Sequence, residues 1–285
     1  MRKENEVIEQ VLQVAKQMEE IRAVIRTNLV PVREYLHSYE FYFIVKDVAV
    51  FDNDEIFEKN LGKRILLYRG DRNYPEFFPE IKGHLMVFED GVTIVINAIS
   101  KASFMKRFKE NGSHGNVWIG NTYLKLMDKD NSLPPIEKTQ EVLQFFTERP
   151  TKENYLGTCA EFFWVLKTFA EYICRKELPA AMFYLNVSVR DMLNRMLRWY
   201  ISIENDFSVE IGILDSYMEK LLPTDFFELY KKTYPIADYA SIWDSLHAAV
   251  ALFHKAGSAI AERSAFEYPD KMEKEIVTLI QNLER

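Results

Sequence analysis

Apolar and polar residues follow two different periods in the first part of the chain. From Val7 to Met18 the apolar residues recur every three or four positions, with Glu and Gln between them, which predicts an amphipathic helix. Two strands are predicted next, from Ile21 to Ile25 and from Tyr39 to Val45. The second is so rich in aromatic and β-branched residues that we expect both of its faces to be covered.

The pattern continues with short elements separated by turn signals. A short helix is predicted from Asp54 to Leu61, ended by Gly62, and a third strand from Lys63 to Tyr68. The dipeptide Asp90-Gly91 lies between two further apolar runs. It predicts a β-hairpin with a two-residue type I′ turn, because this turn needs residues that accept positive φ.

The arms of that hairpin are predicted from Leu85 to Phe88 and from Val92 to Ile96, and a helix from Ser100 to Glu110. Three glycines then follow within nine residues, at positions 112, 115 and 120, and indicate a connection rich in loops.

Beyond the stretch Asn131 to Pro135 and the break at Arg149-Pro150, strand signals fade and helical spacing takes over. Thr151 is a candidate N-cap for a long helix, and Pro179 suits the first turn of the next, which should run to about Asn205. The remaining predicted helices are Ile213 to Leu222, Phe226 to Lys232, Tyr239 to Phe266 and Lys271 to Leu283.

These elements predict an α+β protein of two domains. The polar, proline-containing stretch from Asn131 to Pro135, followed by the break at Arg149-Pro150, is the best candidate boundary. We therefore expect a mixed β-sheet with flanking helices in residues 1–135 and an all-α bundle in residues 136–285.

Composition excludes several classes of protein. With 285 residues, of which 48% are hydrophobic, the chain can bury sizeable cores. A net charge of −7 argues against a nucleic-acid partner but is compatible with a cationic small molecule. The two cysteines are too few for a disulfide framework, and no apolar run is long enough to span a membrane. We expect a cytoplasmic protein without membrane insertion.

Two short segments beside the first strands carry a resemblance to a known family. They are Arg26-Thr27-Asn28 and Ser38-Tyr39-Glu40. Their layout resembles the nucleotidyltransferase core of the aminoglycoside 6-adenylyltransferases, the streptomycin adenylyltransferase family, in which the first strand ends in Gly-Ser-Arg-x-Asn and the second opens with Asp-x-Asp. The resemblance continues through Asp47-Val48, Gly62-Lys63-Arg64-Ile65, Phe88-Glu89-Asp90-Gly91, Arg149-Pro150-Thr151 and Glu161-Phe162.

The resemblance implies adenylyl transfer from ATP with Mg²⁺, but the residues expected to carry the reaction differ. Two cations that bridge ATP phosphates need carboxylate ligands. Ser38 and Glu40 stand at the two Asp-x-Asp positions, and Val95 stands where a third carboxylate is expected. Glu40 alone remains as a weak candidate metal ligand, so no cofactor is firmly predicted, and Mg²⁺ and ATP are expected only if activity remains. Without the resemblance, Ser38 and Glu40 would be ordinary polar residues at a strand edge.

The phosphate-binding positions also differ from those of the family. Arg26, Asn28 and Ser38 are the candidate nucleotide contacts, but the Gly-Ser turn before Arg26 is missing. In the helical half, the resemblance implies Gly-Lys-x-x-Lys at Gly212, and here Ile213 and Ser216 replace the two lysines.

Glu161 matches the acidic position at which the family's helical domain faces the drug, where a carboxylate could accept a hydroxyl proton or pair with an ammonium. The alternative, that Glu161 is an ordinary solvent-exposed residue on a helix, is an equally good interpretation. Trp164, Arg190, Arg195 and Trp199 lie in matching segments, although aromatic and Arg side chains at helical spacing are more often structural.

Three hypotheses follow. The first is a relative of the aminoglycoside 6-adenylyltransferases with little or no activity, a pseudoenzyme. The second is an active enzyme in which Glu40 and a carboxylate such as Glu34 or Asp47 recruit one cation to transfer AMP to an aminoglycoside hydroxyl, as in antibiotic resistance. The third is a non-catalytic protein that binds an aminoglycoside or another cationic small molecule through Glu161.

Overall fold

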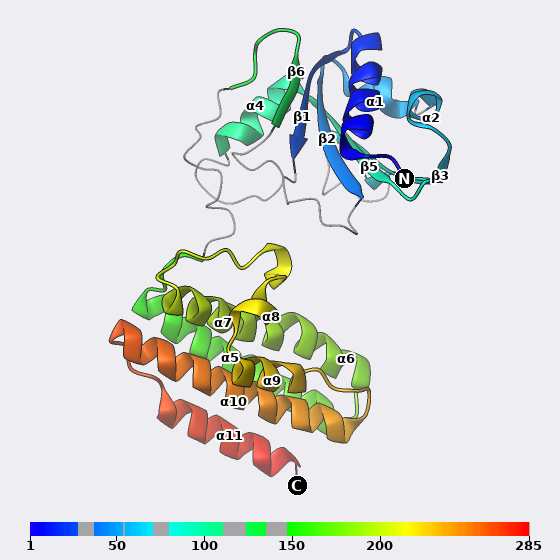
Figure 1. The fold of residues 1–285 in the computed structure, drawn as a ribbon. Helices are drawn as coiled ribbons and strands as arrows, with labels where there is room; N and C mark the ends of the chain where they lie inside the picture. Colours follow the sequence, from blue (N-terminus) through cyan, green and yellow to red (C-terminus); the bar gives the residue numbers. More distant parts are fainter. Residues whose placement is uncertain (28–36, 54, 71–79, 111–123, 135–146, 285) are drawn as a thin grey trace. The chain divides into compact units, whose positions relative to one another are not determined.

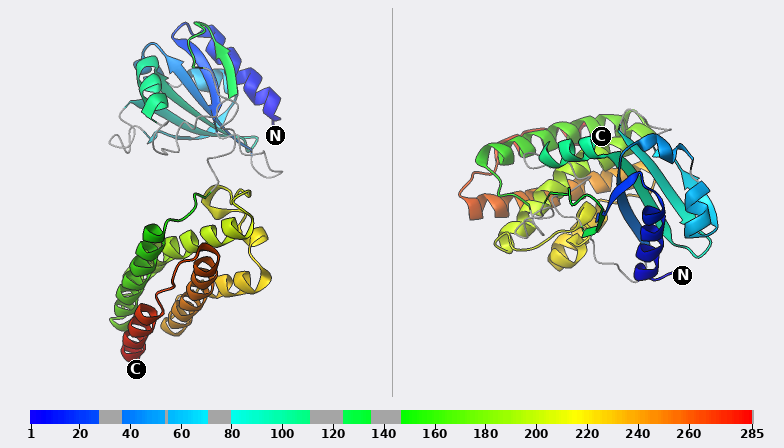
Figure 2. Two further views of the ribbon diagram at one scale, coloured as in Figure 1. Left: turned by 90° about the vertical axis from the view of Figure 1, so that its left-hand side faces the viewer. Right: turned by 90° about the horizontal axis from the view of Figure 1, so that it is seen from above.

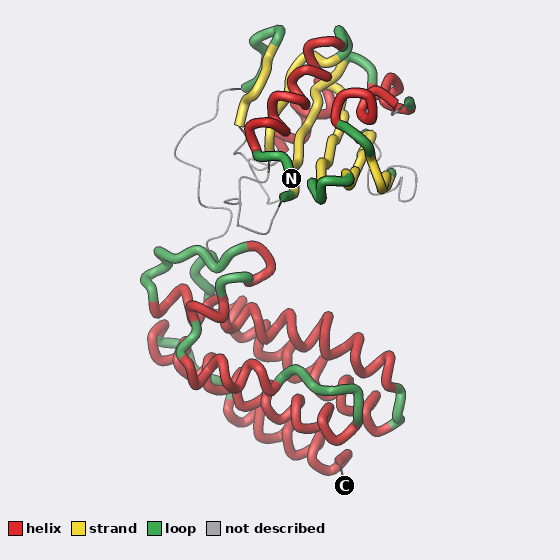
Figure 3. The backbone as a smooth tube through the Cα atoms, turned by 45° about the vertical axis from the view of Figure 1, so that its right-hand side comes forward, coloured by secondary structure: helices red, strands yellow, loops and turns green. Residues whose placement is uncertain are grey.

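The structure is a computed structural model that describes residues 1–27, 37–53, 55–70, 80–110, 124–134 and 147–284. The chain divides into two compact units, Met1–Gln144 and Phe145–Arg285. In the described residues every strand belongs to the first unit, and the second is built of helices and loops (Figure 3). The α+β fold predicted from the sequence is confirmed.

Six strands form one mixed sheet in the first unit. They are β1 (Ile21–Thr27), β2 (Ser38–Val45), β3 (Arg64–Tyr68), β4 (Ile81–Phe88), β5 (Thr93–Ser100) and β6 (Leu124–Asp128). Their order is β3-β4-β5-β2-β1-β6, and only the β2–β5 pair is parallel. The predicted strands are confirmed, whereas β6, an edge strand, was not predicted.

Helices cover both faces of this sheet (Figures 1 and 2). On one face, α1 (Glu4–Gln17) and α2 (Glu55–Leu61) pack on a large apolar core to which alternate residues of β2 contribute, Tyr39, Phe41, Phe43 and Val45. We call this the α1 face. On the other, α4 (Lys101–Glu110) packs on a smaller core that contains Tyr42 and Ile44. We call this the α4 face. Burial on both faces of β2 matches its composition.

The hairpin between β4 and β5 is present, but its turn differs from the prediction. Phe88 N donates to Val92 O at 3.0 Å and Gly91 N donates to Phe88 O at 2.9 Å, so three residues form the loop. Within that loop only Gly91 has a positive φ, of 81°. A type I′ turn needs two such residues, so the predicted turn type is wrong: the geometry is that of a three-residue hairpin loop with glycine in the left-handed position.

The second unit is a helical bundle. Its helices are α5 (Lys152–Cys174), α6 (Leu178–Phe183), α7 (Arg190–Glu204), α8 (Met218–Leu221), α9 (Thr224–Lys232), α10 (Tyr239–Ser264) and α11 (Asp270–Glu284). Thr151 caps α5 as predicted, its hydroxyl accepting from Asn154 N. Pro179 lies in the first turn of α6. Between α6 and α7 the helix continues as a π-helical segment, Tyr184–Val189, that was not predicted.

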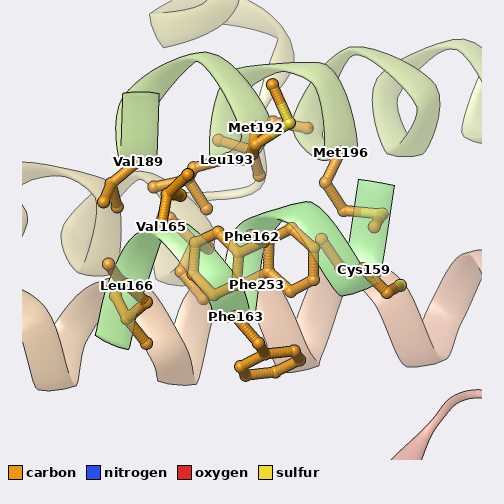
Figure 4. Close-up of a cluster of buried hydrophobic side chains, with 14 of the residues drawn as sticks. Cys159, Phe162, Phe163, Val165, Leu166, Val189, Met192, Leu193, Met196 and Phe253 are labelled. Atoms are coloured by element: carbon orange, nitrogen blue, oxygen red, sulfur yellow. The ribbon is translucent and has the colours of Figure 1, made fainter. Parts of the chain in front are cut away.

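The core of the bundle lies between α5, α7 and α10 (Figure 4). The Phe162 and Phe253 rings stack with centroids 3.7 Å apart, and Leu193 and Met196 of α7 are buried with them. No described helix combines the length and apolar character that crossing a membrane requires.

One predicted helix is largely wrong. Over Ile213 to Leu222 the chain forms a short 3-10 turn, Ile213–Asp215, and then only the four residues of α8. The cause is the backbone, because Gly212, Leu214 and Asp215 all have positive φ angles, which an α-helix does not accommodate.

Candidate functional site

The predicted metal position lies at the start of the parallel strand pair. In the register of β2 and β5, Ser38 is opposite Thr93 and Glu40 is opposite Val95. Alternation along the strands places these four residues on the α4 face. Ser38 is exposed, and Glu40 and Val95 are half-buried. The structure therefore brings together Ser38, Glu40 and Val95, the three positions at which the sequence analysis expects carboxylates.

Glu40 is hydrogen-bonded within the sheet. Asn97, two residues after Val95 on the same face, donates from Nδ2 to Glu40 Oε1 at 2.9 Å. An amide, a hydroxyl and one carboxylate are a poor donor set for Mg²⁺, which needs an octahedron of hard oxygen ligands. Among the described residues no three His, Cys, Asp or Glu side chains come together to hold a metal ion. The residues present do not fit a two-cation centre.

Beyond β5, the part of the α4 face formed by β4 and β3 is largely apolar. The register of β3, β4 and β5 places Leu66, Tyr68, Leu85 and Val87 on the same face as Val95. Leu66 and Tyr68 are 46% and 41% exposed. On this side of β5 the four side chains are aliphatic or aromatic, and they offer no carboxylate to a cation.

Arg26, a candidate nucleotide contact, points away from Glu40. It lies opposite Phe41 in the register and so on the α1 face. Its guanidinium is buried, pairs with Glu4 of α1 and lies over the Tyr39 ring with 5.7 Å between Cζ and the centroid. Burial, with the Glu4 carboxylate nearby, raises the pKa of Tyr39.

Three other predicted nucleotide or metal positions have different outcomes. Asn28 and Glu34 lie outside the described residues. Asp47, the alternative metal ligand, caps a 3-10 helix, Val48–Asp52, its carboxylate accepting from Ala49 N at 2.9 Å.

The Phe88–Gly91 segment has a structural role. Asp90 accepts from the backbone N and from Nε of Arg2, both at 2.9 Å. Arg2 also lies over the Phe88 ring, 4.7 Å from its centroid. These hydrogen bonds hold the pKa of Asp90 well below its usual range. This segment ties the N-terminus to the β4–β5 hairpin.

The candidate drug-contact residues of the second unit lie on α5 and α7. Glu161 is exposed on α5, and Trp164, one turn later, is 69% exposed. On α7, Arg195 pairs with Asp191 at 3.3 Å, and Trp199 is buried in the core. Glu161 and Trp164 thus present a carboxylate and an indole on one helix face, whereas Trp199 contributes to packing.

Arg190 of α7 is held by the segment after α9. Its Nη1 and Nη2 donate to the hydroxyl and to the carbonyl oxygen of Thr233, each at 3.0 Å. The Tyr234 ring lies 3.7 Å from its Cζ. These contacts give Arg190 a structural role between α7 and α9.

Between the two expected lysine positions a carboxylate forms a salt bridge. Ser216 is exposed, and the side chain of Ile213 is outside the described residues. Asp215 lies between them, and Arg198 Nη1 donates to its Oδ1 and Oδ2 at 3.1 and 2.9 Å. Leu214 and Asp215 have φ angles of 53° and 62°, which for residues other than glycine cost about 1 kcal/mol or more each.

The sequence analysis missed Asn97 and Arg198. Asn97 follows Val95 by two positions, so strand alternation alone places both on one face. Arg198 is separated from Asp215 by 17 positions, and nothing in the sequence indicates that a loop folds back onto α7.

Comparison with known proteins decides the family. The profile described as Streptomycin adenylyltransferase matches residues 1–283. The chain belongs to this family. It is 29% identical to an aminoglycoside 6-adenylyltransferase of Bacillus subtilis (strain 168), over 95% of this chain and 94% of that protein. It is also 29% identical to one of Campylobacter jejuni, over 94% of this chain and 92% of that protein.

A solved structure is similar over the whole length as well. The crystal structure of an aminoglycoside 6-adenyltransferase from Bacillus subtilis has 25% sequence identity and a TM-score of 0.49, and the match covers 100% of this chain and 99% of that one. The profile match over residues 1–283 confirms the resemblance that the sequence analysis inferred from short motifs.

Proposed function

We propose that this protein is an aminoglycoside 6-adenylyltransferase relative that transfers AMP slowly or not at all. The observation that carries the proposal is the start of the β2–β5 pair, where Glu40 lies beside Ser38 and Val95 and no group of three His, Cys, Asp or Glu side chains is present among the described residues. Two cations bridging ATP phosphates need several carboxylates, and here the available charge falls to a single one.

The remaining carboxylate is also poorly placed for the reaction. Glu is one methylene longer than Asp, which displaces its oxygens by roughly 1 Å, and a misplacement of that size can cost about a hundredfold in rate. Glu40 Oε1 also accepts a hydrogen bond from Asn97, and a cation that coordinates this oxygen would have to compete with that bond. In the second unit, Asp215 adds negative charge where a triphosphate would need positive charge.

The test combines binding and turnover. Isothermal titration of the full chain with ATP and Mg²⁺ is expected to show no Mg²⁺-dependent binding. An assay with radiolabelled ATP and streptomycin is expected to show no labelled drug. Turnover of about one per second or faster, an ordinary enzymatic rate, would contradict the proposal and favour an active enzyme with one cation at Glu40.

Restoring the acidic residues tests the same idea from the opposite direction. The triple variant S38D/E40D/V95D is expected to bind Mn²⁺ in a titration in which the wild-type chain does not. The matched control S38N/E40Q/V95N has similar side chains without the charges and should not bind. A restored variant that binds no more Mn²⁺ than this control would show that the carboxylates are not what limits the site.

A second function is favoured by Glu161 and Trp164. An exposed carboxylate and an exposed indole one turn apart can bind a cationic, partly apolar small molecule through charge and cation–π contacts. This version predicts streptomycin binding without nucleotide that weakens with salt and is lost in Glu161→Gln. Glu153→Gln, an exposed residue near the start of α5, is the matched control and should bind as the wild type does.

A further inference from the structure

One face of α7 carries polar residues at every fourth position, Arg190, Asn194 and Arg198, which therefore lie in a row. Two of them bind the same carboxylate. Asn194 Nδ2 donates to Asp215 Oδ2 at 3.1 Å, and Arg198 Nη1 donates to both Asp215 oxygens. The guanidinium of Arg198 and the side-chain amide of Asn194 therefore both donate to one carboxylate, which belongs to the same chain.

The backbone that brings this oxyanion to α7 is an unfavourable one. Leu214 and Asp215 both adopt left-handed conformations, which glycine and, to a lesser extent, asparagine accept most readily. The Leu214 side chain is 96% exposed, so burial of this residue does not offset the conformation. This conformation brings the Asp215 carboxylate within hydrogen-bond distance of Arg198 and Asn194.

The pair lies where a ligand could reach it. The Arg198 side chain is 30% exposed and that of Asp215 is 13% exposed, so the carboxylate covers a guanidinium at the edge of the bundle. A carboxylate and a phosphate group present oxygens to a guanidinium in similar ways. A phosphate group in place of the carboxylate could accept from the same two donors.

We propose that Arg198 and Asn194 form a binding site for a phosphate-bearing anion, and that Asp215 occupies it as a tethered competitor. A tethered group acts at an effective concentration in the millimolar range or higher, so a free anion at lower concentration does not displace it. The site is closed in this chain by a single side chain and opens when that side chain loses its charge. The inference concerns the second unit alone and does not rest on the proposed lack of adenylyl transfer.

The test uses the full chain and two variants, D215N and D215G. Both replacements accept the left-handed backbone, so both are expected to fold, which circular dichroism checks. Isothermal titration is done with inorganic pyrophosphate and, separately, with ATP, each without Mg²⁺. Both variants are expected to bind pyrophosphate at least about tenfold more tightly than the wild type, because one charge-assisted contact is of that size.

Two control variants separate the site from general charge effects. D215G/R198Q keeps the loop change but removes the guanidinium, and its binding should return to the wild-type level. L214G relieves the neighbouring backbone without changing any charge and should leave binding unchanged. A clearly larger gain for ATP than for pyrophosphate would identify a nucleotide as the ligand class, and an equal gain, or one for pyrophosphate alone, would identify a polyphosphate group.

Two results would overturn the proposal. One is that D215N and D215G bind pyrophosphate no better than the wild type. The other is that D215G/R198Q retains the gain, which would place the anion elsewhere. Neither result depends on AMP transfer, so an active wild-type enzyme would refute the proposed function and leave this comparison intact.

Discussion

The two faces of the sheet in the first unit place different requirements on the residues of β2. On the α1 face, Phe41 and Phe43 of β2 are fully buried under α1 and α2. On the α4 face, the neighbouring positions Ser38 and Glu40 lie at the start of the strand with Val95 beside them. Because successive side chains alternate, one strand can keep its packing residues while its polar residues change. The packing of β2 on the α1 face therefore does not depend on which residues stand at positions 38 and 40.

The largest expected effect lies on the α1 face. Phe41→Ala removes a fully buried ring and should lower the free energy of unfolding by about 3–5 kcal/mol, measured by urea titration. On the α4 face, Val95→Ala truncates a smaller, half-buried side chain and should cost about 1 kcal/mol. Equal losses would contradict the contrast between the faces.

The Arg2–Asp90 pair is the next test. The pKa of Asp90 is lowered in the folded chain, so its stabilisation is present above the unfolded-state pKa of about 3.9 and is lost as pH falls below it. Asp90→Asn should lose about 1–2 kcal/mol at pH 7, and the difference from the wild type should shrink at pH 3. Glu89→Gln removes a neighbouring exposed carboxylate and should leave this pH dependence unchanged.

Glu40→Gln should have a smaller effect, below about 0.5 kcal/mol, because the amide oxygen can still accept from Asn97. Millimolar Mg²⁺ should leave the melting temperature of both proteins unchanged. If Mg²⁺ raises the melting temperature of the wild type and not of the variant, then Glu40 does hold a cation.

The smallest effect is expected on β3, where neighbouring leucines face opposite ways. Leu66 lies on the α4 face and is 46% exposed, so Leu66→Ser should change stability by no more than about 0.5 kcal/mol. Leu67 packs against the α1-face core, and Leu67→Ser should cost several times as much. Similar melting temperatures for the two variants would argue against the strand orientation described here.

Most of the fold could be predicted because local periodicity and turn chemistry determine it. The amphipathic spacing of α1, the aromatic run of β2 and the N-cap at Thr151 are all local signals, and all three elements are present. The turn at Asp90-Gly91 shows the limit. The dipeptide correctly marks a hairpin, but the loop length depends on which backbone groups pair, and Phe88 pairs with Val92.

The candidate site was harder to predict because it depends on contacts between distant segments. Ser38, Glu40 and Val95 come together only through the parallel register of β2 and β5, which was not predicted from the sequence. The predicted helix over Ile213 to Leu222 was wrong for a related reason. Its apolar spacing is helical, but the backbone at Leu214 and Asp215 is left-handed and is secured by Arg198 of α7.

The π-helical segment Tyr184–Val189 has a consequence for how related chains should be compared. A π-type turn contains one more residue than the α-helical turn that it interrupts. It is therefore equivalent to a single inserted amino acid within a continuous helix. A homologue in which this segment is a regular α-helix should have one amino acid fewer between the positions of Leu178 and Glu204. Sequence alignments that force equal lengths would then shift the whole row Arg190, Asn194 and Arg198 by about a quarter turn of the helix.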